Sequence, residues 1–181
     1  NEHKTTISRL PDGLYRSHYL EYYPYSLKRQ KHISFKHFEY TLLTVLDIHR
    51  RNPGTSILEK FFSELFNTNK ELKIRFSCNY YNKYLEIKKM IELIFFTKRE
   101  SKKLLCHILS VCEKLYESYK KEFPDLKKYI EDKIVKEIQI ASKYGSTFEV
   151  VWYIYFSRFV GLGIKNFDQL VHNQTIKENA F

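Results

Sequence analysis

Residues 15–40 hold the side chains of this sequence that are best suited to binding. Tyrosines and histidines alternate there with Lys28, Arg29, Lys31 and Lys36. Aromatic rings stack on unpaired bases while cations hold the phosphate backbone, so the mixture favours single strands or hybrid duplexes of nucleic acid. The alternative is that the tyrosines pack this segment onto a core, because aromatic side chains bury large apolar areas. Both interpretations stay open at this level.

The cysteines and histidines do not form the four-donor set that a structural zinc site needs. Cys78, Cys106 and Cys112 are odd in number, and the C-x5-C spacing of the last two fits no usual ligand pattern. His107 and Cys112 are five residues apart without a third ligand nearby. We therefore predict no metal site, and expect buried free thiols in a reducing cytoplasm.

Familiar catalytic signatures are missing from the sequence. It contains no G-x-x-x-x-G-K-[ST], G-x-G-x-x-G, H-E-x-x-H or G-x-S-x-G segment. We expect no complete catalytic site in the chain. No apolar run approaches the ~18 to 20 residues needed to span a bilayer, and the first residues do not resemble a cleavable signal. These features predict a cytoplasmic piece of a longer protein with no membrane partner.

The net charge of +10 is unevenly distributed along the chain. The first 103 residues carry 20 Lys and Arg against 11 Asp and Glu, whereas residues 104–181 carry 11 against 10. A positive half of this kind attracts polyanions, of which nucleic acid is the commonest inside a cell. A solvated lysine-rich surface is the alternative.

The spacing of apolar residues predicts an all-α fold. Residues 1–32 look extended or irregular, with a turn signal at Pro11-Asp12-Gly13. Beyond them, apolar residues recur every three to four positions, and Gly and Pro separate the segments. We expect about seven helices in antiparallel hairpins, either a bundle or an irregular HEAT-like helical repeat. They lie at about 35–51, 56–66, 81–96, 101–119, 125–141, 147–160 and 166–171.

The next-to-last of these helices has an unusual composition. Val150 to Val160 is apolar nearly all round, which predicts a helix in the middle of a packed bundle. Ser146, Thr147 and Glu149 resemble a capping box, in which side chains accept from the first amide groups of a helix.

Three segments of the chain resemble the bacterial abortive-infection and phage-defence group of reverse transcriptases. The opening NEHKTTISRLPDGL is similar to the N-x-x-K-T-x-I-x-x-L-P pattern that ends the palm in these enzymes. ISFKHFEYTLLTVLDIHRRNPGTSILEKFFSEL resembles the helix, turn and helix that follow the palm. YGSTFEVVWYIYFSRFVGLGI resembles a late Trp-containing helix of the family. The resemblance implies an end of palm and connector at 1–32, thumb-like helices at 33–78 and a C-terminal helical domain at 79–181.

The resemblance also implies roles for particular residues. Asn1, Lys4 and Thr5 would belong to the end-of-palm motif, with Lys4 near the phosphates of the incoming nucleotide. A cation there offsets charge that develops on the leaving pyrophosphate. The carboxylates that hold Mg²⁺ for polymerisation would lie upstream of Asn1. The predicted nucleic-acid contacts are Lys4, Thr5, Arg16, Lys28, Arg29, Lys31 and Lys36.

These inferences support two hypotheses of different classes. In the first, the chain is the C-terminal helical portion of a defence-associated RNA-directed or template-independent DNA polymerase. It would grip a single strand or hybrid duplex, contact the upstream polymerase domain and form homo-oligomers. In the second, it is a helical protein-interaction scaffold that binds no nucleic acid.

Overall fold

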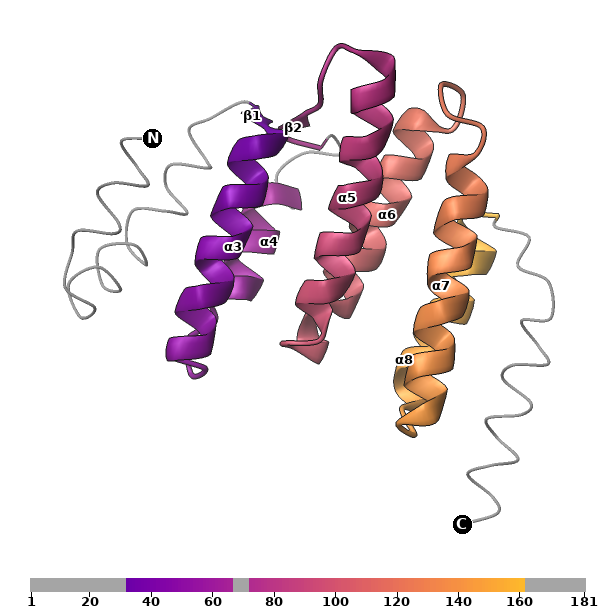
Figure 1. Ribbon diagram of the computed structural model, residues 1–181. Coiled ribbons are helices and arrows are strands. Elements are labelled where there is room, and N and C mark those ends of the chain that lie inside the picture. The colour runs from indigo at the N-terminus through magenta and orange to yellow at the C-terminus, as the bar shows by residue number, and fades with distance from the viewer. Residues whose placement is uncertain (1–31, 67–71, 162–181) are drawn as a thin grey trace, which may run out of the picture. The chain divides into compact units, whose positions relative to one another are not determined.

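The computed structural model describes residues 32–66 and 72–161, and every structural statement below concerns these ranges. They contain six α-helices and one short two-stranded sheet, so the all-α fold class is confirmed (Figure 1). The chain forms two compact units, Asn1–Cys78 and Asn79–Phe181. The expected helix at 166–171 and the extended stretch up to residue 31 lie outside the described residues. The assignment of segments to palm, thumb and C-terminal domain stays a prediction.

The first unit is built on a helical hairpin of α3 (Phe35–Arg51) and α4 (Ile57–Phe66). Ser34 begins α3, because its hydroxyl accepts a 3.1 Å hydrogen bond from the amide of His37. The apolar faces of the two helices meet in a buried aromatic contact, with the Phe38 and Phe61 rings 6.1 Å apart. Hydrophobic burial at this contact holds the hairpin together.

A parallel pair of two-residue strands closes the first unit. β1 (Ile33–Ser34) pairs with β2 (Ile74–Arg75), and Ile33 lies opposite Ile74. The amide of Ile33 also donates a 2.7 Å hydrogen bond to the carbonyl of Lys73. Sequence reasoning missed these strands, because two residues are too few to show the alternation that marks a strand.

The second unit consists of two helical hairpins in two layers. Its helices are α5 (Tyr80–Lys98), α6 (Leu105–Tyr119), α7 (Leu126–Lys143) and α8 (Thr147–Phe159). A 3-10 turn at Lys102–Leu104 leads into α6. Figure 1 shows α5 beside α7 in one layer and α6 beside α8 in the other. This pairing of hairpins is the arrangement expected of a helical repeat.

The core of the second unit is aliphatic between the layers and aromatic at one end. Each helix contributes fully buried side chains, among them Ile91, Ile108, Ile134 and Val150. Phe123, in the connection from α6 to α7, is buried among the rings of Tyr80, Tyr84 and Tyr119 at centroid distances of 4.7, 4.8 and 6.3 Å. None of the helices in either described range is long and apolar enough to cross a membrane.

Two expectations about α8 were wrong. The predicted capping box does not form, because Ser146 makes no side-chain cap and the Glu149 carboxylate turns inward to Lys98. Nor is the helix enclosed on all sides. Phe148, Trp152 and Tyr155 are exposed on one face, while Tyr153 is buried on the other. A helix on the outer side of a two-layer stack is covered on one face by its neighbours, whatever its composition.

The turn between α7 and α8 generates a prediction. Gly145 has φ = +72°, and no atom lies within 4 Å of the position a Cβ would occupy there. Gly145→Ala should therefore destabilise the protein by about 1–2 kcal/mol through backbone strain alone. Gly145→Asn should cost less, because asparagine tolerates the left-handed conformation. Urea unfolding of both variants measures the difference, and an equal loss would show that strain is not the cause.

Candidate functional site

The structure describes one of the seven residues predicted to contact nucleic acid. Lys36 lies in the first turn of α3 and its side chain is exposed. Whether it contacts nucleic acid stays a prediction. The other six lie outside the described residues, so their predicted role is also untested: Lys4, Thr5, Arg16, Lys28, Arg29 and Lys31.

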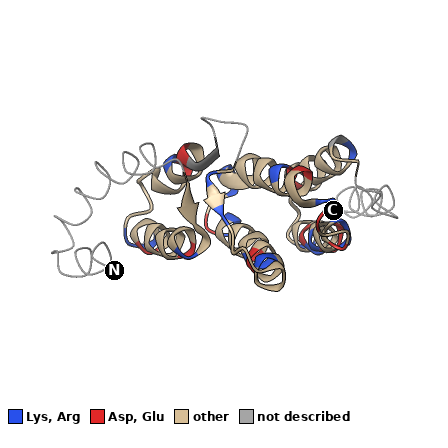
Figure 2. Cartoon of the chain, turned by 90° about the horizontal axis from the view of Figure 1, so that it is seen from above, with Lys and Arg blue, Asp and Glu red and all other residues tan. Residues whose placement is uncertain are grey.

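Folding makes the described surface more basic than the sequence suggests. Sixteen Lys and Arg side chains are exposed, against six Asp and Glu side chains. Glu137 and Glu149 are buried, and most other carboxylates are half-buried. Figure 2 shows basic residues on the helices of both units. Residues 104–181 have nearly equal numbers of basic and acidic residues in the sequence. Among those that the structure describes, however, exposed cations outnumber exposed carboxylates.

One end of the second unit combines such cations with exposed aromatic rings. We call Tyr80, Tyr81, Lys121, Lys127 and Lys128 the tyrosine–lysine end. Tyr80 and Tyr81 are 58% and 70% exposed. Tyr80 is fixed beside the α6–α7 connection, because its hydroxyl donates a 3.1 Å hydrogen bond to the carbonyl of Glu122. The three lysines are exposed and make no ion pair with any described residue.

Two of these lysines lie where a helix favours a bound anion. Lys127 and Lys128 are in the first turn of α7; that turn contains no acidic residue, and the Asp125 side chain makes no capping hydrogen bond. The N-terminus of a helix carries a partial positive charge that attracts anions. A phosphate backbone would therefore be attracted to this end of α7.

A buried ion cluster fixes α8 to α5 and α7. The Lys98 ammonium lies 2.6 Å from the Glu149 carboxylate and 3.5 Å from that of Glu137, and all three residues are at most 5% exposed. Lys133 approaches the second oxygen of Glu137 at 3.5 Å. Sequence reasoning missed the cluster because its members are spread over three helices.

Two buried aromatic rings, Tyr153 and Phe95, contact the lysines of the ion cluster. The Lys98 ammonium also lies 5.6 Å from the centre of the Tyr153 ring, a cation–π contact. Burial raises the pKa of the Tyr153 phenol, and the nearby Glu137 and Glu149 carboxylates raise it further. The phenol is therefore neutral at every physiological pH. The ion cluster holds α8 in position through Glu149.

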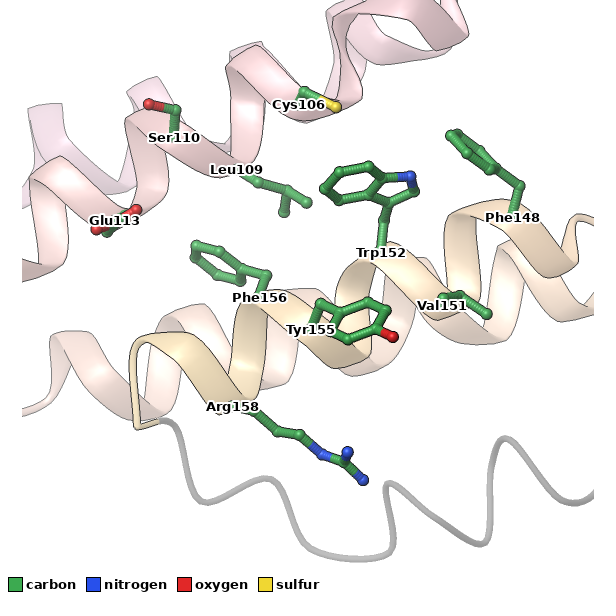
Figure 3. A pocket seen from close by; sticks show the side chains of 10 residues that line it. All are labelled: Cys106, Leu109, Ser110, Glu113, Phe148, Val151, Trp152, Tyr155, Phe156 and Arg158. Carbon is green, nitrogen blue, oxygen red and sulfur yellow. The ribbon is translucent and has the colours of Figure 1, made fainter.

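The outer face of α8 and the facing side of α6 form an apolar groove of about 920 Å³. Figure 3 shows Trp152 and Phe156 directed toward α6, where Leu109 and Cys106 line the opposite wall. The Phe148 ring meets the Trp152 ring edge-on at 6.0 Å. The remaining lining residues are Ser110, Glu113, Val151, Tyr155 and Arg158.

The polar rim of the groove is partly desolvated. Burial raises the pKa of the Glu113 carboxyl, and the neighbouring Glu117 raises it further while Lys114 opposes the shift. Arg158, in the last turn of α8, also lines the groove, and its side chain is exposed. The groove thus offers an aromatic floor with one acidic and one basic group at its rim.

The expectation of buried thiols holds for one cysteine of three. Cys112 is buried in the core, and burial raises the pKa of its thiol, so it stays protonated. Cys78 and Cys106 are exposed. Cys106 has apolar residues near it in the sequence, but the fold leaves its position open, whereas Cys78 lies between Ser77 and Asn79. Within residues 32–66 and 72–161, no three His, Cys, Asp or Glu side chains are grouped so as to hold a metal ion.

Comparison with protein-family models, with curated proteins and with solved structures found no match to this chain.

The ion cluster generates a second prediction. Lys98→Met leaves two buried carboxylates without their closest cation and should destabilise the protein by about 3 kcal/mol. The double variant Lys98→Met, Glu149→Gln should recover part of this loss, because it also removes the charge of Glu149, which Lys98→Met alone leaves without a partner. Urea unfolding followed by the fluorescence of Trp152 measures both.

Lys120→Met is the matched control for this prediction. It removes an exposed pair, in which Lys120 lies 2.9 Å from Glu117, and should leave the stability almost unchanged, because solvent screens exposed ion pairs. Equal losses for Lys98→Met and Lys120→Met would show that the buried cluster does not hold α8.

Proposed function

We propose that the chain is a non-catalytic helical module that binds single-stranded or hybrid nucleic acid for a defence-type reverse transcriptase. The observation that carries the proposal is the excess of exposed cations, sixteen against six exposed carboxylates. Such a surface lowers the free energy of a bound polyanion by releasing its counterions.

The tyrosine–lysine end is one part of the described surface that fits this role. Lys121, Lys127 and Lys128 can contact consecutive phosphates, and the ring of Tyr81 can stack on an unpaired base. Stacking requires an exposed ring, and Tyr81 is 70% exposed. A strand bound there would also neutralise the lysines at the start of α7.

The resemblance to defence-type reverse transcriptases supplies the wider setting. In that setting Lys4 and Thr5 end the palm, and Arg16, Lys28, Arg29, Lys31 and Lys36 grip the template or product. The Mg²⁺ ions and the carboxylates that bind them would belong to the upstream polymerase domain. Nucleotide addition would occur there, while this chain holds the nucleic acid and contributes surfaces for assembly, including assembly with other copies.

A helical interaction scaffold is the second candidate function. The apolar groove between α6 and α8 favours it, because contiguous exposed apolar surface marks sites of protein contact and aromatic anchors dominate their affinity. The two functions use different faces and are separable by experiment.

The nucleic-acid proposal predicts a charge-dependent affinity with a defined location. The full chain should bind a labelled single-stranded RNA at about 50 mM salt and lose affinity steeply by about 200 mM. The triple variant Lys121→Gln, Lys127→Gln, Lys128→Gln should reduce the slope of log K against log salt by about 2, the value for three lost contacts to a single strand. Fluorescence anisotropy across the salt series provides both quantities.

The control is a variant that loses the same charge at the opposite end of α6 and α7: Lys102→Gln, Lys103→Gln, Lys143→Gln. These side chains are also exposed. An equal effect of both triple variants would mean that binding is not localised at the tyrosine–lysine end. Absence of binding by the unmodified chain at low salt would contradict the proposal and favour the scaffold.

A further inference from the structure

The lysines of the tyrosine–lysine end do not by themselves select a single strand over a duplex. Lys121, Lys127 and Lys128 would contact phosphates, and a duplex carries at least as many phosphates as a single strand. The two forms differ in their bases, because the faces of paired bases are covered by the bases stacked above and below. Aromatic side chains detect this difference by stacking on an uncovered base. Selectivity at this end therefore depends on which of its rings is available for stacking.

Two tyrosines of α5 are held against the connection from α6 to α7. Tyr80 and Tyr84 are four residues apart and so lie on one face of the helix. The centres of their rings lie 4.7 and 4.8 Å from that of the buried Phe123. The hydroxyl of Tyr80 also donates its hydrogen bond to the carbonyl of Glu122. This face of α5 therefore has a structural role.

Tyr81 points to a different side of α5 and is available for stacking. Its side chain is 70% exposed and makes no hydrogen bond or ring contact with any residue that the structure describes. Leu85, one turn further on, shares its face of the helix and is 43% exposed, which gives the ring an apolar neighbour.

The backbone that carries Tyr81 is fixed before any ligand binds. Asn79 caps α5, because its side chain accepts a 3.1 Å hydrogen bond from the amide of Asn82. The contact of Tyr80 with Glu122 holds the same turn of the helix from the other side. A base that stacks on Tyr81 would therefore not have to order the backbone, which lowers the free-energy cost of binding.

We propose that Tyr81, with Leu85 beside it, is a stacking platform that makes the tyrosine–lysine end select unpaired bases over duplexes, hybrid duplexes included. This selectivity rests on the proposed function, because it requires the lysines to bind nucleic acid. The lysines supply affinity for the phosphate backbone, and Tyr81 supplies the preference for an unpaired base. RNA and DNA single strands are both ligands, because stacking uses the base and not the sugar.

The test measures the affinity of the full chain and of Tyr81→Ala for probes of equal length at about 50 mM salt. Tyr81→Ala should bind single-stranded RNA and DNA roughly tenfold more weakly, the loss expected for one stacked base. Its affinity for an RNA–DNA hybrid duplex should be unchanged. Tyr81→Phe should bind every probe like the unmodified chain, because stacking needs the ring and not the hydroxyl. Fluorescence anisotropy provides all the affinities.

An abasic single strand separates the contribution of the bases from that of the backbone. It keeps the phosphates and lacks the bases, so the unmodified chain should bind it about as weakly as Tyr81→Ala binds the normal strand. Tyr144→Ala is the matched control, because Tyr144 is 78% exposed at the opposite end of α7. This control should bind like the unmodified chain. Circular dichroism confirms that each variant is folded.

Three outcomes would overturn the inference. They are an equal loss of affinity for single strand and duplex in Tyr81→Ala, an undiminished affinity of this variant for the single strand, and equal affinities of the unmodified chain for normal and abasic strands. In each of them the chain still binds nucleic acid, so the proposed function stands. Absence of binding to every probe would remove the proposed function and the selectivity of Tyr81 together.

Discussion

The ammonium of Lys98 lies between the carboxylates of Glu149 and Glu137 in a place that water does not reach. It comes from the end of α5, whereas its partners come from α8 and α7. A buried charge without a partner is so costly that this contact restricts how α8 can rotate about its own axis. With Glu149 and Tyr153 directed inward, Phe148, Trp152 and Tyr155 lie on the exposed side of α8. The ion cluster therefore helps to determine which face of α8 lines the groove.

The exposure of the remaining charged side chains shapes the electrostatics of the surface. Glu137 and Glu149 are buried together with Lys73 and Lys98, so the excess of exposed cations arises because more carboxylates than lysines are half-buried. The second unit thereby separates two properties in space. Three exposed lysines and two exposed tyrosines lie together at the end where α6 meets α7, and the aromatic groove lies between α6 and α8. Polyanion binding and helix docking would use different surfaces of one small stack.

Several features could be predicted from the sequence because they depend on neighbours along the chain. The cap at Ser34, the all-α class and the approximate positions of six helices follow from apolar spacing and from the residues that begin and end helices. Errors occurred where distant residues decide the outcome. Ser146 and Glu149 had the spacing of a capping box, but a cation 51 residues away competes for the carboxylate. Cys106 looked like a core residue because its neighbours are apolar, although the fold leaves its side chain in the open groove.

The sequence by itself determined which segments are helical, how many cations the chain carries and that three thiols are available. Composition and periodicity suffice for these properties. Only the tertiary structure decided which carboxylates are buried, which rings of α8 face water and that α6 and α8 enclose a groove. Each of these depends on the packing of helices that are far apart in sequence, and a helix of nearly uniform apolar composition contains no local signal for the face it will bury.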